Sequence, residues 1–446
     1  MKPYPPLGIL YISAYLEQHG FQNEVFDSTF SSIDNLKIYL LRGKPDIIGI
    51  YTNLMTKLNV LKIISFIKHE VSLKHTKIIL GGPEVRNHKV KFLEYGADII
   101  VFGEGEETMR EVVEAFSGNT NALHNIAGIA FKDENRNIIT NADRVLIKDI
   151  NNLPFANRKK IDLRQYFTAW KNKHGISMMN VSTMRGCPYS CKWCSRAVYG
   201  ASYRRRNPAL VVDEIELLQQ EYSFDKIWFV DDVFTINHRW LREFADEIQK
   251  RGVIISYEII TRADRLTEEA VQLLKQSGCF RVWVGAESGS QKIIDAMDRR
   301  VKVEQVREMI RLVKSYGMEA GTFIMLGYPG EDEKDIKETL HHLKYADPDF
   351  YTITVAYPIK GTPLYAEVED IFTQDLEWEN STDRDIDFKR SYNRRYYDYA
   401  MQWIQCEMVK SKANVGMQNL LFSLRSLKAR TGMFWEKMRS SKTVSV

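Results

Sequence analysis

The apolar positions of residues 1–118 fall into short runs that are separated by amphipathic stretches. Runs of this kind, bounded by turn residues, predict buried strands; they are Glu24–Asp27, Asp46–Tyr51, Lys77–Leu80 and Asp98–Phe102. The amphipathic stretches predict helices near residues 31–42, 57–70, 86–95 and 106–116, after an earlier helix over Gly8–Gln18. Buried strands that alternate with helices predict a parallel, doubly wound sheet, which binds ligands at the carboxyl ends of its strands.

Residues 176–360 repeat the alternation of strand and helix about six times. Two of the helices, Val211–Gln220 and Arg239–Lys250, show clear helical periodicity. Unbroken alternation predicts a parallel sheet with outer helices, and six units predict a partial barrel. The predicted strands lie near residues 177–183, 226–231, 254–260, 280–286, 320–326 and 350–356. Between the two regions, residues 119–175 contain a predicted hairpin (128–131 with 137–140) and a linker.

Polar or Gly residues follow each predicted strand of the second region. A βα barrel places its catalytic and binding residues at the carboxyl ends of its strands. A polar or Gly-rich segment after every predicted strand therefore indicates an active site at that end. These segments are a cysteine-rich loop after the first strand, then Asp231-Asp232, Arg262-Ala263-Asp264, Glu287-Ser288-Gly289-Ser290, Gly327–Glu331, and Pro358 with Gly361–Pro363.

The cysteine-rich loop holds three of the chain's five cysteines, Cys187, Cys191 and Cys194. Thiolates this close together select an iron–sulfur cluster, zinc or cuprous ion. Structural zinc takes a fourth ligand, usually from a second Cys or His pair, and the sequence offers no such pair nearby. Three thiolates on a [4Fe–4S] cluster leave one iron open to a substrate or cofactor. The alternative, three buried apolar cysteines, fits poorly with a polar loop that also carries Gly and Pro.

The spacing Cys187-x3-Cys191-x2-Cys194, with Trp193 before the last cysteine, resembles the signature of radical S-adenosylmethionine (SAM) enzymes. In that family the open iron binds the amino and carboxylate groups of SAM, and the reduced cluster cleaves SAM to a 5′-deoxyadenosyl radical. The resemblance therefore implies that the three cysteines hold the cluster.

The strand ends also resemble the radical SAM core, in the subfamily that has a cobalamin-binding domain. This resemblance implies that Trp193 packs near the adenine, that Asp231 and Glu287 with Ser288 contact the amino group or ribose, and that Arg262 pairs with a carboxylate. For Asp232, Asp264 and Glu331, a structural ion pair or strand-end cap explains the residue equally well. The run Tyr203-Arg204-Arg205-Arg206 either binds an anion or is a solvated charged segment.

The N-terminal region resembles the cobalamin-binding domain of the same subfamily through Pro5-Pro6-Leu7-Gly8, Gly81-Gly82-Pro83-Glu84 and Gly103-Glu104-Gly105-Glu106. The implied cobalamin-binding residues are Gly81, Gly82, Gly103, Glu104 and Gly105. From composition alone, the same glycines can simply make tight strand-to-helix turns. The sequence departs from the family's pattern because the first strand before Pro5-Pro6 is missing and no Asp-x-His-x-x-Gly element is present. Cobalamin, if bound, would therefore lack a protein histidine ligand.

Composition narrows the functional class further. The net charge of +4 over 446 residues gives no argument for nucleic acid as a partner. Five cysteines, three of them clustered, do not form a disulfide framework, which favours a reducing, cytoplasmic setting. Cys279 and Cys406 are expected to be packing residues. No apolar run is long enough to span a membrane.

Residues 367–446 match no catalytic pattern. The aromatic helical stretch Ser391–Lys410 either caps the barrel mouth or packs outside it. From Asn414 onward, six Lys or Arg stand against one acid, which favours a solvated or disordered tail, with weak contact to a membrane surface as the alternative.

Together these observations predict an α/β protein with four parts. They are a flavodoxin-like cobalamin-binding domain (1–118), a hairpin and linker (119–175), a TIM-like partial (β/α)6 radical SAM core (176–366), and a mostly helical C-terminal region with a basic tail (367–446).

The first functional hypothesis is a methyltransferase that uses a [4Fe–4S] cluster, SAM and cobalamin on a small-molecule or lipid-like substrate. It takes electrons from a reductant such as flavodoxin or ferredoxin. The alternatives are an oxidoreductase that closes rings, a radical SAM enzyme without corrin, and a non-catalytic iron–sulfur or zinc protein. No catalytic residue beyond the cofactor ligands is assigned.

Overall fold

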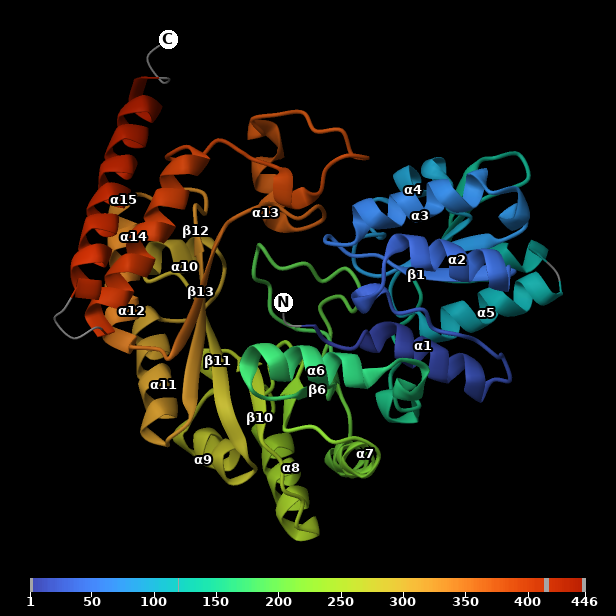
Figure 1. The fold of residues 1–446 in the computed structure, drawn as a ribbon, viewed down its shortest axis with the longest axis horizontal. Helices are drawn as coiled ribbons and strands as arrows, with labels where there is room; N and C mark the ends of the chain where they lie inside the picture. Colours follow the sequence, from blue (N-terminus) through green and yellow to red (C-terminus); the bar gives the residue numbers. More distant parts are fainter. Residues whose placement is uncertain (1–2, 119, 413–416, 443–446) are drawn as a thin grey trace. The chain divides into compact units, whose positions relative to one another are not determined.

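The computed structural model describes residues 3–118, 120–412 and 417–442 (Figure 1). The chain forms two compact units. The first unit consists of Met1–Tyr189, Ser195–Trp228 and Leu376–Arg384. The second consists of Ser190–Cys194, Phe229–Asp375 and Asp385–Val446. Each unit therefore takes segments that lie far apart in the sequence.

The first unit contains a five-stranded sheet in the order β1-β2-β3-β4-β5. Strands β1, β2 and β3 are parallel, whereas β3, β4 and β5 pair in antiparallel fashion. The predicted hairpin forms as β4 and β5, but it extends the N-terminal sheet, so this sheet is mixed and not wholly parallel. The strands are β1 (Ile47–Tyr51), β2 (Lys77–Gly81), β3 (Ile99–Val101), β4 (Ile129–Lys132) and β5 (Ile138–Thr140).

Helices cover both faces of this sheet, as a doubly wound fold requires. Helices α2 (Ile33–Gly43), α3 (Lys57–His69) and α4 (Lys89–Tyr95) share one apolar core with Ile78 and Leu80 of β2. Helices α1 (Leu7–Gln18) and α5 (Glu106–Ser117) share a second core with Ile79 of the same strand. Because successive side chains of a strand point to opposite faces, an unbroken apolar strand can supply both cores.

The predicted strand over Glu24–Asp27 is wrong, because this segment forms no strand in the structure. Its last residue, Asp27, accepts hydrogen bonds from the amide of Thr29 (3.0 Å) and from the hydroxyl of Tyr166. These bonds cap a short 3-10 turn at Ser28–Phe30. Side-chain capping of this kind competes with strand pairing, which an apolar pattern alone does not reveal.

The second sheet has six strands in the order β13-β12-β11-β10-β9-β6. The pairs β10–β11, β11–β12 and β12–β13 are parallel. Neighbouring strands follow the chain order, which confirms the predicted partial barrel. All six predicted strands form: β6 (Met178–Val181), β9 (Lys226–Phe229), β10 (Tyr257–Thr261), β11 (Cys279–Glu287), β12 (Glu319–Leu326) and β13 (Phe350–Val355).

Helices connect the strands of this sheet. Asn207 caps one of them and Asn237 another, and each Asn side chain accepts a hydrogen bond from a backbone amide of the first turn. The helices are α7 (Pro208–Glu221), α8 (His238–Arg251), α9 (Glu268–Gln276), α10 (Gln291–Ala296), α11 (Val303–Ser315) and α12 (Glu333–Ala346), and α6 (Leu163–His174) precedes β6.

The C-terminal region is helical, with α13 (Pro363–Val368), α14 (Arg394–Lys412) and α15 (Met417–Lys442). Helix α14 packs on α12 and α15 and buries Tyr396 and Tyr397, so the aromatic stretch forms an outer packing helix (Figure 1). Residues 417–442 are helical, so the disordered alternative for the tail is wrong, whereas most of the described side chains of this helix are exposed to solvent. In the described part of the chain, we find no helix with the length and apolarity needed to cross a bilayer.

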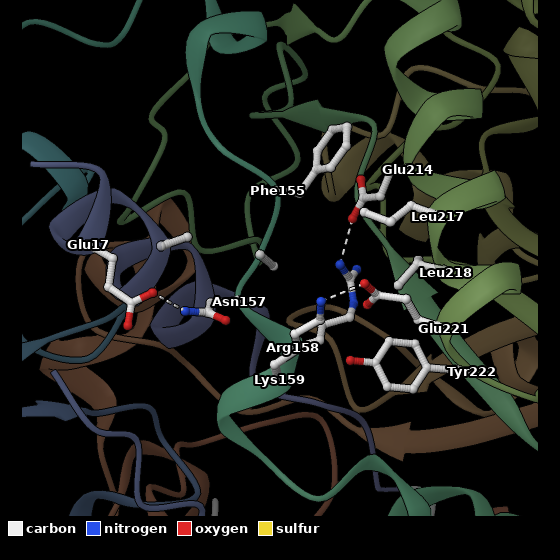
Figure 2. A pocket seen from close by; sticks show the side chains of 12 residues that line it. Glu17, Phe155, Asn157, Arg158, Lys159, Glu214, Leu217, Leu218, Glu221 and Tyr222 are labelled. Carbon is white, nitrogen blue, oxygen red and sulfur yellow. Dashed lines mark hydrogen bonds and ion pairs between the residues drawn. The ribbon is translucent and has the colours of Figure 1, made fainter. Parts of the chain in front are cut away.

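A buried charge network fixes the linker before β6 to helix α7. Glu214 is fully buried and pairs with Arg158 (2.6 Å) and Arg206 (2.5 Å). Burial raises the pKa of Glu214, but the two guanidinium groups outweigh this effect and hold the pKa below its usual value. Figure 2 shows Arg158 and Glu214 in the wall of a cavity of about 280 Å³, where Lys159 also pairs with Glu221.

We expect the substitution Glu214→Ala to lower the free energy of unfolding by about 3–5 kcal/mol, since it leaves two buried cations without their anion. Glu221→Ala removes a partly exposed pair on the same helix and should cost at most about 1 kcal/mol. Urea unfolding at pH 7, followed by circular dichroism, measures both changes. Equal losses for the two variants would contradict a specific role for the buried network.

Candidate functional site

Short strands close the base of the cysteine loop in the first unit. Strands β7 (Met184–Arg185) and β8 (Arg204–Arg205) pair in antiparallel fashion, so Met184 lies opposite Arg205. Gly186 then turns the chain with φ +85°, and a Cβ here would lie 2.4 Å from the Ser202 hydroxyl oxygen. Only glycine therefore fits immediately before the first cysteine.

The middle cysteine lies between two arginines in the second unit. The Sγ atom of Cys191 accepts hydrogen bonds from Arg262 and Arg299, each at 3.6 Å. All three residues are buried. Both guanidinium groups therefore direct N–H donors at the sulfur of Cys191.

The rest of the loop is held by the segments that follow α10 and precede α13. The amide of Lys192 donates to the carbonyl of Met297 (3.1 Å), and the amide of Leu364 donates to the carbonyl of Lys192 (3.0 Å). The indole of Trp193 packs against the cluster of apolar side chains that includes Met297 and Tyr328. The predicted adenine neighbour is therefore fixed beside Cys194.

The predicted SAM-binding residues lie at the carboxyl ends of β9, β10 and β11. Arg262 follows β10, and besides Cys191 it binds the carboxylate of Asp264 (2.8 Å) and the carbonyl of Arg299 (2.7 Å). Glu287 ends β11 with φ +66°, and burial raises the pKa of its carboxyl.

Two further candidates are buried at these strand ends. Asp231 follows β9 and is buried. The hydroxyl of Ser288 accepts a hydrogen bond from the amide of Ser290 (3.1 Å) and lies 3.2 Å from the hydroxyl of Thr339. The Ser288 hydroxyl is thus already engaged within the protein. Its assignment to SAM stays a prediction.

Arg299 is a site residue that the sequence reasoning missed. It donates to Cys191 and to the carbonyl of Gly285 (2.8 Å), its Nη2 lies 4.0 Å from Glu287, and its guanidinium lies 5.7 Å from the centroid of Trp193. Its Nε is buried without a hydrogen-bond partner. The Arg299-Arg300 pair after α10 was the available signal, but it resembles an ordinary charged segment.

A cavity of about 460 Å³ lies at the carboxyl ends of β1, β2 and β3 in the first unit. All five predicted cobalamin-binding residues line it: Gly81, Gly82, Gly103, Glu104 and Gly105. Gly82 has φ +107°, and a Cβ there would lie 2.4 Å from the carbonyl oxygen of Thr52. Most of the other lining side chains are apolar, including Pro5, Ile12 and Met109. No histidine is among the described residues that line it.

Glu104 joins this cavity to the cysteine loop. Its carboxylate is buried and pairs with Arg185 (2.8 Å) and Arg204 (2.6 Å), the two residues that close the loop's base. Arg185 also pairs with Glu106. The run of arginines after the loop is therefore structural at Arg204.

The segment after the cysteines forms part of the cavity wall. Val198 and Tyr199 line the cavity together with the glycines of the sheet. Burial raises the pKa of the Tyr199 hydroxyl to about 12, so this group stays protonated at neutral pH. Sequence analysis did not single out either residue, because neither belongs to a strand end or a motif.

Comparison with known proteins identifies two domains. Residues 181–343 match the model of the radical SAM superfamily, and residues 2–113 match that of the B12 binding domain. An uncharacterized methyltransferase of Pyrococcus horikoshii is 28% identical over 81% of this chain and 78% of its own. The anaerobic magnesium-protoporphyrin IX monomethyl ester cyclase of Cereibacter sphaeroides is 26% identical over 82% of this chain and 61% of its own.

Solved structures share the fold. The cobalamin-dependent SAM radical enzyme OxsB has a TM-score of 0.75 at 18% identity, over 97% of this chain and 70% of its own. The radical SAM methyltransferase TsrM from Kitasatospora setae has a TM-score of 0.71 at 19% identity, over 86% of this chain and 78% of its own.

These domains imply a [4Fe–4S] cluster, SAM and cobalamin, and the residues present fit all three groups. The loop offers three cysteines that form no disulfide, and Arg262 and Arg299 lie beside the buried one, Cys191. The buried, unbonded Nε of Arg299 is a donor for an anionic group such as the SAM carboxylate. The apolar, glycine-lined cavity suits a flat macrocycle. The chain thus combines a radical SAM domain with a B12 binding domain.

Proposed function

We propose that this protein transfers a methyl group to an unactivated centre of a small-molecule or lipid-like substrate. When bound, the cluster and SAM supply a 5′-deoxyadenosyl radical and the corrin supplies the methyl group. The chain's own residues hold these groups close together and exclude water from them.

One observation carries the proposal. Val198 and Tyr199, four and five residues after the last cluster cysteine, line the same cavity as the glycines of the B12-binding sheet. In addition, Glu104 of that cavity pairs with Arg185, two residues before Cys187. The corrin cavity, the base of the cysteine loop and its first cysteine, Cys187, thus lie within one compact unit, which supports transfer between neighbouring cofactors.

On this proposal each residue at the strand ends has a defined task. Cys187, Cys191 and Cys194 hold the cluster, and Arg262 and Arg299 donate to the Cys191 sulfur and offer donors to the SAM carboxylate. Glu287 accepts from the amino group of SAM, and Trp193 packs against the adenine. Asp231 and Ser288 lie near the same end of the sheet as candidates for the ribose.

Electrons come from an external reductant such as flavodoxin or ferredoxin. Cys279 begins β11, at the opposite end of the strand from Glu287, and Cys406 lies on α14. Neither is placed to hold a second cluster with the loop cysteines. Free thiols and an oxygen-sensitive cluster suit the reducing cytoplasm.

A ring-closing oxidation is the second candidate. The cyclase of Cereibacter sphaeroides aligns over 82% of this chain, about as much as the methyltransferase relative. Both reactions begin with the same cleavage of SAM. They differ in whether a methyl group appears in the product, which labelled SAM would show.

We expect Cys191→Ala to abolish the formation of 5′-deoxyadenosine, because the buried thiolate between the two arginines is lost. Anaerobically reconstituted protein with dithionite and SAM, analysed by chromatography, measures the product. Cys279→Ala is the matched control, since this cysteine is outside the loop, and it should retain activity. Wild-type amounts of product from Cys191→Ala would refute the proposal.

We also expect Gly81→Leu to reduce the co-purifying corrin at least tenfold. The added side chain has room at its Cβ, where the nearest atom is 3.8 Å away, but it fills the cavity. Gly43→Leu, at a glycine with nothing within 4 Å, is the control and should keep wild-type corrin content. Corrin absorbance per protein measures both. Equal corrin in all three proteins would place the cobalamin elsewhere.

A further inference from the structure

A buried group of three metal-binding side chains lies in the first unit, outside the cofactor sites. Glu84 follows β2, His88 caps the start of α4, and Asp383 comes from the segment Leu376–Arg384, which returns to this unit late in the chain. Each side chain is at most 8% exposed. One ligand atom of each lies within 4.8 Å of the others.

The separations suit metal ligands better than hydrogen bonds. His88 Nε2 lies 3.6 Å from Glu84 Oε1 and 3.9 Å from Asp383 Oδ1, both too far for a hydrogen bond. Ligands that each lie about 2.0–2.2 Å from one tetrahedral metal ion are about 3.3–3.6 Å apart, so a small adjustment of Asp383 would complete the set. Glu84 Oε1 is buried and has no hydrogen-bond partner, although it faces this gap.

The local charge also favours a cation. The nearest positive group, Lys57, donates to the carbonyl of Ser381 (2.8 Å) and lies 4.3 Å from the ring centroid of Trp378. Two buried acidic side chains thus share this gap with the imidazole, a set of groups that favours a cation over an anion.

We propose that Glu84, His88 and Asp383 bind a divalent transition-metal ion, with Zn²⁺ as the representative. One imidazole nitrogen and two carboxylate oxygens form a ligand set that such ions accept. The ion joins the segment Leu376–Arg384 to the B12-binding domain, close to Gly82 at the cavity edge. It is a structural site, distinct from the cluster loop.

Zinc binding to the full-length protein tests this site, in a background of Cys187→Ala, Cys191→Ala and Cys194→Ala that removes the loop thiolates. We expect this chelator-stripped background to bind about one equivalent of Zn²⁺ in calorimetry. Adding His88→Ala or Asp383→Asn should weaken binding at least tenfold, whereas His69→Ala, an exposed histidine of the same unit, should not.

Hydrogen exchange provides a readout that does not depend on these variants folding well. Zn²⁺ should slow amide exchange in peptides that cover residues 376–384 of the background protein. The proposal is overturned if the background binds no zinc, if it binds equally with and without Asp383→Asn, or if zinc leaves this exchange unchanged.

An independent observation concerns the outer surface of helix α15. The buried face of α15 combines Ala429 and Met433 with two polar residues: Ser426 donates to Glu407 (2.8 Å), and Glu436 accepts from Asn393 (2.8 Å). The opposite face carries large apolar side chains that are 46–63% exposed, namely Leu420, Leu424, Leu427, Phe434, Trp435 and Met438. A helix that packs only on the core of its own protein buries its large apolar side chains and exposes its polar ones.

Basic residues border this apolar stripe on both sides. At 100° per residue, Arg425, Lys428 and Arg439 fall along one edge, and Arg430 and Lys437 fall along the other. All five are exposed. Two of these five residues are ion-paired, Arg439 with Glu436 of the same helix (3.1 Å) and Lys437 with Glu333 (2.6 Å), so Arg425, Lys428 and Arg430 supply most of the positive charge of the outer face.

We infer that α15 lies on an anionic lipid surface, with the apolar stripe in the headgroup region and the basic edges on the lipid phosphates. This pattern of apolar centre and basic borders is that of helices that bind in the plane of a membrane. A purely apolar protein partner would not explain the two basic edges, whereas negatively charged lipids complement them.

Flotation of the full-length protein with phosphatidylcholine vesicles tests this inference. One set of vesicles contains ~30% phosphatidylglycerol, which makes the surface anionic, and the other contains none. We expect binding to the anionic vesicles, at least tenfold weaker binding for Leu424→Glu with Leu427→Glu, and weaker binding at higher salt. Leu217→Glu, at a partly exposed leucine of α7, should bind normally.

A second copy of the chain is the competing occupant of this surface. The inference is overturned if the wild-type protein does not float with anionic vesicles. It is also overturned if light scattering shows a dimer that the Leu424→Glu, Leu427→Glu variant breaks while vesicle binding is unchanged.

Discussion

The buried carboxylate of Glu104 is the contact on which the rest of the site depends. It belongs to the turn after β3 and pairs with Arg185 and Arg204, which lie on the two strands that close the cysteine loop. A buried carboxylate that lost either arginine would be left with uncompensated charge, which costs several kcal/mol (about 3–5). The network therefore specifies one position for the loop's base relative to the B12-binding sheet.

The cysteine loop contributes to both compact units. Cys187 belongs to the first unit, whereas Cys191 and Cys194 belong to the second. The first unit supplies the corrin cavity and the base of the loop, and the second supplies Arg262 and Arg299 for Cys191. The three cysteines of this short loop thus belong to both compact units.

Segments late in the sequence also have definite tasks. Residues 376–384 return to the first unit and place Trp378 on the apolar core of α3 and α4. Helix α15 packs on α14 and leaves its large apolar side chains outward. On the proposals above, the first segment anchors the B12-binding domain and α15 anchors the whole protein. Neither segment contributes a residue to the cofactor sites.

The sequence alone determined the alternation of strands and helices, the three cysteines and the glycines of the cavity, because periodicity and motif spacing are local properties. It did not reveal Arg299, Val198 or Tyr199, whose neighbours are distant in the chain. It also misread Glu24–Asp27, where side-chain capping replaces strand pairing, and the tail, where packing on α14 orders a basic segment as helix α15. Only the tertiary structure decided these points, because burial and charge pairing depend on contacts between residues that no local pattern connects.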